Sequence, residues 1–288
     1  MSYILSADIG GTKIATALSH VRSPQQLLYR DEFLSIQQGD ELFNRLIHSF
    51  QRLSQQAAIE EIDTVSIAIP GIIDREQGVV QYQANLPWRN FPLKQKLEEY
   101  FPFARIDIDG DVVTAAFGEY KARQFSKQTL IYVTLSTGIS CATISNGQII
   151  RGAGMSGEIG FSMTEQHGFL EHLAAGPGLT QMLNQHLEKS HTLKEWMTVY
   201  YEGDEQVQQL IHYALKQFAK TVHTLMMALD PHVVVLGGGV FNNHPLLVEK
   251  VNEFVDSYYT LPIFEGKKRR IEPSLNKENA GLIGAAYK

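Results

Sequence analysis

Three short glycine-rich loops are the residues in this sequence whose types and spacing most suggest chemistry. They read Gly10–Gly11–Thr12–Lys13, Thr137–Gly138 and Gly237–Gly238–Gly239. Glycine lets the backbone approach a ligand closely, and successive N–H groups in such turns form concavities that bind phosphate. One such loop is consistent with an ordinary turn, whereas three of them indicate a ligand that carries phosphate. They match neither the dinucleotide-binding pattern nor the P-loop pattern, which disfavours both kinds of site.

Each loop follows a segment with the pattern of a buried strand. These short apolar runs occupy residues 3–7, 129–135 and 233–236. Because open α/β sheets bind ligands at the carboxyl ends of their strands, the placement of the loops favours a nucleotide site. A returning strand is expected at 14–18, and a hairpin at 141–150 that turns at Asn146–Gly147. The two halves of the chain therefore open in the same way.

Helical patterns alternate with the strands. A helix is expected from Asp40, its proposed N-cap, with an apolar face that continues to Leu53. A second apolar stripe runs from Val207 to Leu225. A strand at 106–108 would deliver Asp111 to its carboxyl end. Strands that alternate with helices predict an α/β protein, and the repeated opening predicts two lobes.

Composition narrows the range of partners. With 288 residues, 44% of them hydrophobic, the chain is long enough for one large domain or two ordinary ones. Its 25 basic and 31 acidic residues give a net charge of -6, without the basic excess that nucleic acid binding needs. No apolar run approaches the roughly 20 residues of a membrane span. The single cysteine, Cys141, excludes an internal disulfide and favours a reducing, cytoplasmic setting.

Several segments together resemble the ROK family of bacterial sugar kinases and repressors, within the actin and hexokinase superfamily. Segments 8–13 and 135–139 are similar to the two phosphate motifs of the family, and 235–240 to its adenosine-side loop. Segment 111–119 resembles the stretch that carries the catalytic aspartate. Segments 157–160 and 170–177 resemble the sugar-facing motifs, and the ending at 280–286 is also typical. The matches run in family order along nearly the whole chain.

The resemblance implies a fold and an assembly. The fold is α/β, with two duplicated ribonuclease-H-like lobes, as in actin and hexokinase, and a cleft between them. We expect an N-terminal lobe at 1–118, completed by a C-terminal helix at 276–288, and a C-terminal lobe at 119–275. The resemblance also implies a homodimer.

The resemblance assigns roles to single residues. It implies that ATP with Mg²⁺ phosphorylates a sugar hydroxyl, most often the 6-hydroxyl of a hexose or N-acetylhexosamine, with Asp111 as general base. Asp111 could instead cap the helix that follows it. Asp8 would hold Mg²⁺, and Thr12 and Thr137 would bind phosphate, while Lys13 could bind phosphate or simply be solvated. The implied sugar-side residues are Gly71, Asn85, Gly110, Glu158 and Glu171, with Trp88 either a platform or a packing residue.

Two positions depart from the family pattern. Gly110 stands where most members have Asn, and Phe161 replaces a histidine that in many members contacts the sugar and ligates a structural zinc. The zinc-binding cysteines are also missing, and His167 and His172 alone cannot supply four ligands, so we predict no structural zinc. Phe161 could shape the site for a different sugar, such as one with an N-acetyl group, or mark a relaxed site.

Alternative functions follow from these departures and from the family. Kinases for N-acetylmannosamine and for glucose both occur in it, and segment 203–212 leans toward the former. Gly110 and Phe161 also allow a sugar-binding protein with weak or no kinase activity. A sugar-responsive transcription regulator is disfavoured, because only residues 1–7 precede Asp8 and leave no room for a helix-turn-helix domain.

Overall fold

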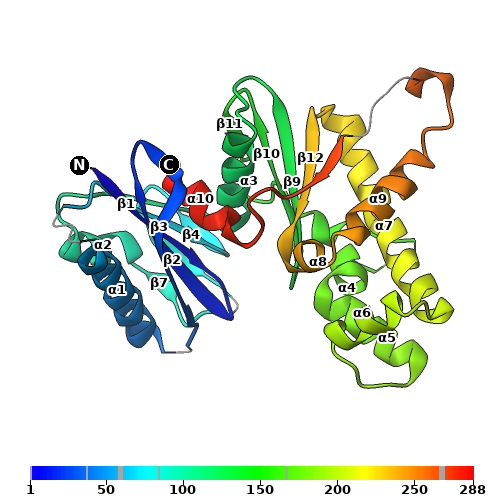
Figure 1. Ribbon diagram of the computed structural model, residues 1–288, viewed down its shortest axis with the longest axis horizontal. Helices are drawn as coiled ribbons and strands as arrows, with labels where there is room; N and C mark the ends of the chain where they lie inside the picture. The colour runs from blue at the N-terminus through cyan, green and yellow to red at the C-terminus, as the bar shows by residue number, and fades with distance from the viewer. Residues whose placement is uncertain (1, 37, 58–60, 84, 166–167, 266–269) are drawn as a thin grey trace. The chain divides into compact units, whose positions relative to one another are not determined.

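The computed structural model describes residues 2–36, 38–57, 61–83, 85–165, 168–265 and 270–288. It divides into two compact units (Figure 1). Unit 1 comprises Met1–Phe125 and Asn279–Lys288, and unit 2 comprises Ser126–Glu278. The division differs from the one expected at 118–119. Helix α3 (Asp111–Ala122) continues past that point, and its residues Glu119 and Tyr120 are buried.

Unit 1 is built on a five-stranded mixed sheet in the order β3-β2-β1-β4-β8. Its strands are β1 (Tyr3–Ile9), β2 (Lys13–His20), β3 (Ser23–Leu34), β4 (Thr64–Ile69) and β8 (Arg105–Gly110). The β1–β2 and β2–β3 pairs are antiparallel, and β1, β4 and β8 run parallel. The carboxyl ends of these three parallel strands therefore meet at one edge, where the first glycine loop and Asp111 follow.

Helices cover both faces of this sheet (Figure 1). Helices α1 (Gly39–Gln56) and α2 (Leu93–Tyr100) share one apolar core with the sheet, whereas α3 packs with α10 (Ala280–Ala286) on the other face. The prediction of Asp40 as N-cap is wrong. Helix α1 begins at Gly39, so Asp40 lies in its first turn and Gln38 occupies the cap position.

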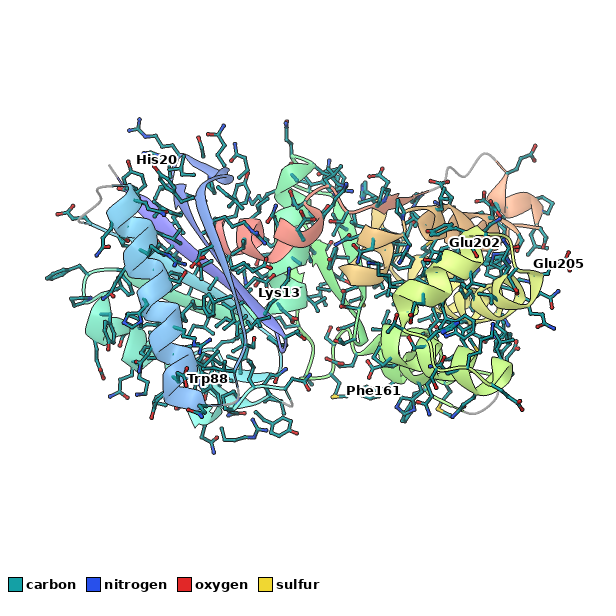
Figure 2. All side chains as sticks on the ribbon, turned by 60° about the horizontal axis from the view of Figure 1, so that its bottom comes forward. Lys13, His20, Trp88, Phe161, Glu202 and Glu205 are labelled. Atoms are coloured by element: carbon teal, nitrogen blue, oxygen red, sulfur yellow. The ribbon has the colours of Figure 1, made fainter. Side chains whose placement is uncertain are left out.

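A small antiparallel sheet completes unit 1. It consists of β5 (Ile72–Asp74), β6 (Val79–Tyr82) and β7 (Arg89–Phe91). Trp88, directly before β7, is 1% exposed, and its ring stacks on Phe91 with centroids 4.6 Å apart. Its indole N–H donates to the Gly39 carbonyl at 3.0 Å, beside the start of α1 (Figure 2). Trp88 is therefore a packing residue.

Unit 2 repeats the sheet of unit 1. Its order is β11-β10-β9-β12-β13, with β9 (Thr129–Leu135), β10 (Ile139–Ser145), β11 (Gln148–Ile150), β12 (Val233–Gly237) and β13 (Ile271–Pro273). Two antiparallel pairs are again followed by two parallel pairs. The hairpin prediction is confirmed, since Asn146 and Gly147 have φ of 51° and 73°. The α/β fold thus consists of two units with one topology.

The helices of unit 2 form a second large core with its sheet. They are α4 (Leu170–Ala174), α5 (Gly176–Leu187), α6 (Leu193–Tyr201), α7 (Glu205–Leu229), α8 (Gly238–Asn243) and α9 (Leu246–Asp256). Short 3₁₀ helices span Ile159–Phe161 and Pro262–Phe264, and a third, Lys277–Asn279, precedes α10. Asp204 caps α7 by accepting from the Val207 N–H at 2.9 Å. In the part of the chain that is described, every helix is too short or too polar to cross a membrane.

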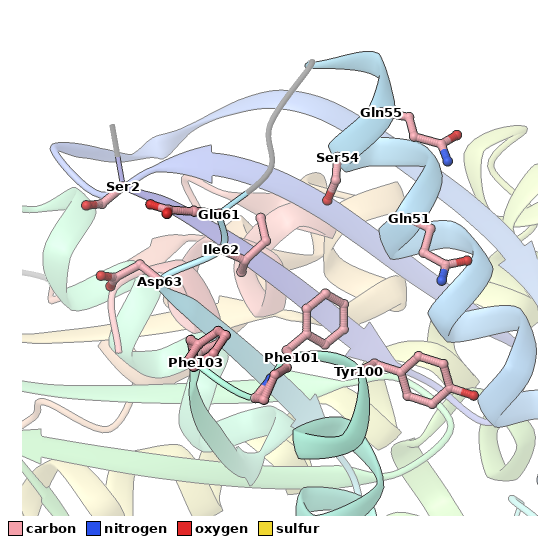
Figure 3. A pocket seen from close by; sticks show the side chains of 12 residues that line it. Ser2, Gln51, Ser54, Gln55, Glu61, Ile62, Asp63, Tyr100, Phe101 and Phe103 are labelled. Atoms are coloured by element: carbon pink, nitrogen blue, oxygen red, sulfur yellow. The ribbon is translucent and has the colours of Figure 1, made fainter.

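A hollow of unit 1, shown in Figure 3, lies away from the glycine loop. Ser2 and Asp63, at the amino ends of β1 and β4, line a cavity of about 590 Å³ together with Tyr100, Phe101 and Phe103. The first glycine loop leaves the opposite, carboxyl end of β1. This cavity is therefore separate from the predicted site residues of unit 1.

Candidate active site

Asp8 and Asp111 provide the carboxylates of unit 1. Alternation along β1 places Ala7 and Ile9 in the core and Asp8 on the opposite face, which α10 covers. The approach is close, since a Cβ on Gly281 of α10 would lie 2.2 Å from the Asp8 Oδ2. Burial, and then the negative charge of Asp111, raises the pKa of Asp8 to about 7. A cation between these two carboxylates would relieve their repulsion.

Asp111 begins helix α3 directly after β8. Its Oδ1 accepts from the Val112 N–H at 2.8 Å, but Gly110 occupies the cap position and no side chain caps the helix, so the capping alternative for Asp111 is wrong. Burial raises the pKa of Asp111, although hydrogen bonds from backbone N–H groups partly oppose the shift. A half-buried carboxylate with a raised pKa is suited to accept a proton.

The first glycine loop is a tight turn between β1 and β2. The Gly10 N–H donates to the Lys13 carbonyl at 2.9 Å, and the Ser35 hydroxyl donates to the Gly10 carbonyl at 2.6 Å. Thr12 is exposed at its tip. The Lys13 ammonium lies 3.1 Å from the Glu32 carboxylate on β3, and the two groups form an ion pair on the surface of the sheet. Thr12 is thus open to a ligand, whereas Lys13 already has a carboxylate partner.

The predicted sugar-side residues of unit 1 lie near this loop. A Cβ on Gly11 would lie 2.6 Å from the Asn85 Cβ, so the two residues are in contact. Gly71 follows β4 and packs so tightly that a Cβ would lie 2.3 Å from the Tyr82 carbonyl. Gly110 differs, because the nearest atom to its Cβ would be 3.8 Å away, on Val113. A Cβ would therefore fit at Gly110.

The second and third glycine loops both contribute residues to the lining of a cavity of about 570 Å³ in unit 2. Because β9 and β12 are parallel neighbours, their loops leave the sheet side by side. Thr137 and Gly239 both line the cavity. Gly238 has φ of 86° and, with Gly237, packs on the end of β9. The structure thus brings Thr137 and Gly239 to one pocket, while Gly237 and Gly238 position the loop.

Other residues of this cavity were not predicted. Gly176 and Pro177, at the start of α5, line it, although their segment resembled a sugar-facing motif. Lys194, Asn243 and His244 line it as well. Burial lowers the pKa of His244, whose Nδ1 lies 3.3 Å from the Tyr201 hydroxyl. The position of Asn243 and His244 at the end of α8, which opens with the third glycine loop, was the signal available in the sequence.

The sugar-facing motifs pack against the start of β10. Glu158 is exposed, directly before the 3₁₀ helix Ile159–Phe161. Glu171, on α4, is half-buried, and its Oε2 accepts from the Ile139 N–H at 3.0 Å. Burial, together with the charge of Glu158, raises the pKa of Cys141 to about 12. The thiol therefore stays protonated at neutral pH.

Phe161, labelled in Figure 2, is an exposed residue that contacts a second aromatic ring. It is 47% exposed and meets Phe169 edge-on, with ring centroids 5.5 Å apart. Phe169 meets the His172 ring at the same distance, 5.5 Å. Among the described residues, no group of three or more His, Cys, Asp or Glu is arranged to hold a metal ion. His167 lies outside the described residues.

We predict that the purified protein contains no stoichiometric zinc, because Phe161 replaces a ligand and Cys141 lies within β10. Elemental analysis after dialysis against metal-free buffer should find far less than one zinc per chain. Recovery of about one zinc per chain would overturn the prediction.

Comparisons with known proteins identify the family of the chain. A sequence model described as the ROK family matches residues 4–287. The glucokinase of Halalkalibacterium halodurans is 26% identical across 99% of this chain and 94% of its own length. The N-acetylmannosamine kinase of Escherichia coli (strain SMS-3-5 / SECEC) is 28% identical across 98% of this chain and 96% of its own.

Two solved structures of ROK family proteins are similar to this chain. The ROK hexokinase from Thermus thermophilus superposes with a TM-score of 0.83 at 26% identity, covering 99% of this chain and 97% of that one. The ROK family glucokinase from Streptomyces griseus, in complex with glucose and AMPPNP, gives 0.81 at 20% identity, covering 99% and 98%. The likeness extends over both units.

Proposed function

The chain belongs to the ROK family, and from this premise we propose that it is an ATP-dependent kinase that phosphorylates a hexose or an N-acetylhexosamine. The observation that carries the proposal is the placement of Asp8 and Asp111 at the strand edge that bears the first glycine loop, where the charge of Asp111 contributes to the raised pKa of Asp8. The likeness to relatives named glucokinase and N-acetylmannosamine kinase supports the same class of reaction. The 6-hydroxyl as acceptor, a homodimer and a cytoplasmic location complete the proposal and rest on the family resemblance.

Asp111 is the proposed general base. Its carboxylate takes the proton of the attacking sugar hydroxyl as the new oxygen–phosphorus bond forms and the bond to the leaving nucleotide breaks. The hydrogen bond from Val112 fixes one carboxylate oxygen and so orients the other. Phosphoryl transfer is catalysed mainly by positioning and charge stabilisation, so one oriented carboxylate is the only proton acceptor that the step requires.

The nucleotide is proposed to occupy the cavity of unit 2. Its volume of about 570 Å³ lies within the usual range for small-molecule sites of about 300–1,000 Å³. Thr137 would donate its hydroxyl to phosphate oxygens, and Gly239 would let the backbone approach, whereas Gly138 does not line the cavity and packs on Glu171. The Asp8 carboxylate is a hard oxygen ligand of the kind that Mg²⁺ prefers. Bound Mg²⁺ would neutralise negative charge on the phosphates.

A sugar panel tests the proposal. Glucose, mannose, fructose, N-acetylglucosamine and N-acetylmannosamine would each be mixed with ATP and Mg²⁺, and ADP release followed against a sugar-free control. At least one sugar should raise ADP release well above the control. If none does, the kinase proposal fails. Calorimetry that showed sugar binding without ATP binding would then support the alternative sugar-binding protein, which Gly110 and Phe161 motivate.

The raised pKa of Asp8 predicts a pH-dependent affinity for magnesium nucleotide. Below pH 7 the Asp8 carboxyl holds a proton that a cation must displace, so the affinity for Mg²⁺-AMPPNP should rise about tenfold between pH 6 and pH 8. Titration calorimetry at three pH values measures the effect, and Asp8→Asn should bind weakly and without the pH dependence. An unchanged slope in Asp8→Asn would assign the titration to another group.

A further inference from the structure

Glu171 contacts two functional segments of unit 2 at once. Its Oε2 accepts from the Ile139 N–H at 3.0 Å, directly after the phosphate loop Ser136–Gly138. The same oxygen would lie 2.6 Å from a Cβ on Gly138 and 3.0 Å from a Cβ on Gly160. The carboxylate therefore fills the space between the phosphate loop and the sugar-facing 3₁₀ helix, where only glycine on both sides leaves room for it.

The phosphate loop and the 3₁₀ helix Ile159–Phe161 also meet at Ile139. The Ile139 carbonyl would lie 2.5 Å from a Cβ on Gly160, so this strand residue is in backbone contact with the sugar-facing helix. The Ser136 N–H donates to the Gly138 carbonyl at 2.9 Å, which closes the phosphate loop into a tight turn. A shift of the Glu171 carboxylate would leave the Ile139 N–H without this acceptor, directly beside the loop that ends at Gly138.

Only one of the two Glu171 oxygens is used in this way. Oε1 has no hydrogen-bond partner among the described residues, and the side chain is half-buried. A carboxylate oxygen next to a sugar-facing motif is a strong acceptor for a hydroxyl proton. A hydroxyl on Oε1 would fix the side chain and draw its negative charge away from the site of the phosphates.

We propose that Glu171 couples the two substrates: a sugar hydroxyl on Oε1 holds Oε2 on the Ile139 N–H and so orders the phosphate loop for the nucleotide. The inference rests on the proposed function, because it requires a sugar and a nucleotide in this unit. Bound sugar then strengthens nucleotide binding, and by linkage bound nucleotide strengthens sugar binding by the same factor. Glu171 is a positioning residue for the phosphate loop in addition to its predicted contact with the sugar.

Titration calorimetry with AMPPNP and Mg²⁺, with and without saturating sugar, measures the coupling. The sugar is glucose or N-acetylmannosamine, whichever the wild type binds. We expect a coupling of about fivefold or more in the wild-type protein. Glu171→Gln keeps an oxygen for the Ile139 N–H but loses the negative charge, so this variant should bind nucleotide more tightly without sugar. Its coupling between sugar and nucleotide should fall below about twofold. Glu171→Asp keeps the charge but is too short to serve both partners, so its coupling should also fall.

Glu158→Gln is the matched control, because Glu158 is also a predicted sugar contact but is exposed and lies in the other motif, directly before the 3₁₀ helix Ile159–Phe161. It should weaken sugar binding yet keep the wild-type coupling once sugar is saturating. Wild-type coupling in both Glu171 variants would overturn the inference, as would an equal loss in Glu158→Gln. If the wild type bound no sugar of the panel, the proposed function would fail first, so the two failures are distinguishable. Thermal unfolding curves check that each variant folds.

Discussion

Replacing Asp111 with Asn is expected to lower kcat for sugar phosphorylation by about 10²–10⁴-fold, the usual contribution of a general base. Asparagine has nearly the same shape and can still accept from the Val112 N–H through its amide oxygen. The helix start should therefore survive, while the group that accepts the hydroxyl proton is lost. Steady-state kinetics with the best sugar of the panel, with KM for both substrates, measure the effect.

Asp107→Asn provides the control for this substitution. Asp107 lies on the same strand, β8, and is half-buried, but it precedes the carboxyl edge that carries Asp111. Its replacement should leave kcat within about twofold of wild type, as expected for a carboxylate outside the reaction. A wild-type kcat in Asp111→Asn would show that another group accepts the proton, and the assignment of Asp111 would be wrong.

Gly284→Ala should destabilise unit 1 by about 3 kcal/mol, at the upper end of the usual cost of overpacking a core. A Cβ on Gly284 would lie 1.8 Å from the Thr114 carbonyl of α3, an atom that cannot move without its helix. Helices α3 and α10 must then separate. Because α3 begins with Asp111 and α10 covers Asp8, kcat should fall together with stability. Urea unfolding and kinetics on the same preparation measure both.

Gly39→Ala is the matched control in the same unit. Its Cβ would meet the Trp88 ring at 3.4 Å, an ordinary contact, at the first residue of α1. Its unfolding free energy should stay within about 1 kcal/mol of wild type. If Gly284→Ala were as stable as this control, the close packing of α3 on α10 would not hold in solution.

The parts of the fold that could be predicted from the sequence are those marked by a pattern within one short segment, such as an apolar run, a turn or a helical stripe. Strand β9 matches its expected range, 129–135, because an apolar run there ends at a glycine loop, and the hairpin at Asn146–Gly147 carries its own turn signal. The long stripe from Val207 to Leu225 became the buried face of α7. Asp40 was misplaced because the helix begins one residue earlier, and the ends of helices depend on contacts beyond the sequence pattern.

What the sequence could not predict depends on residues far apart in the chain. The mutual effect of Asp8 and Asp111 on the site arises only when β1 and β8 flank β4. Trp88 was left between two roles until its contacts with Gly39 and Phe91 placed it in the core. Asn243, His244 and Lys194 joined the nucleotide cavity from α8 and α6, which no single motif connects. The sequence motifs therefore predict the glycine loops, whereas the residues that surround each loop are known only from the tertiary structure.

Identification of the product tests the central claim most directly. The reaction of ATP with the best sugar of the panel would be followed by phosphorus NMR and mass spectrometry. The account predicts one sugar phosphate for each ADP formed, with the phosphoryl group on the 6-hydroxyl, and almost no product with Asp111→Asn. ADP formed without sugar phosphate, or no ADP with any sugar, would contradict the assignment of this ROK protein as a sugar kinase.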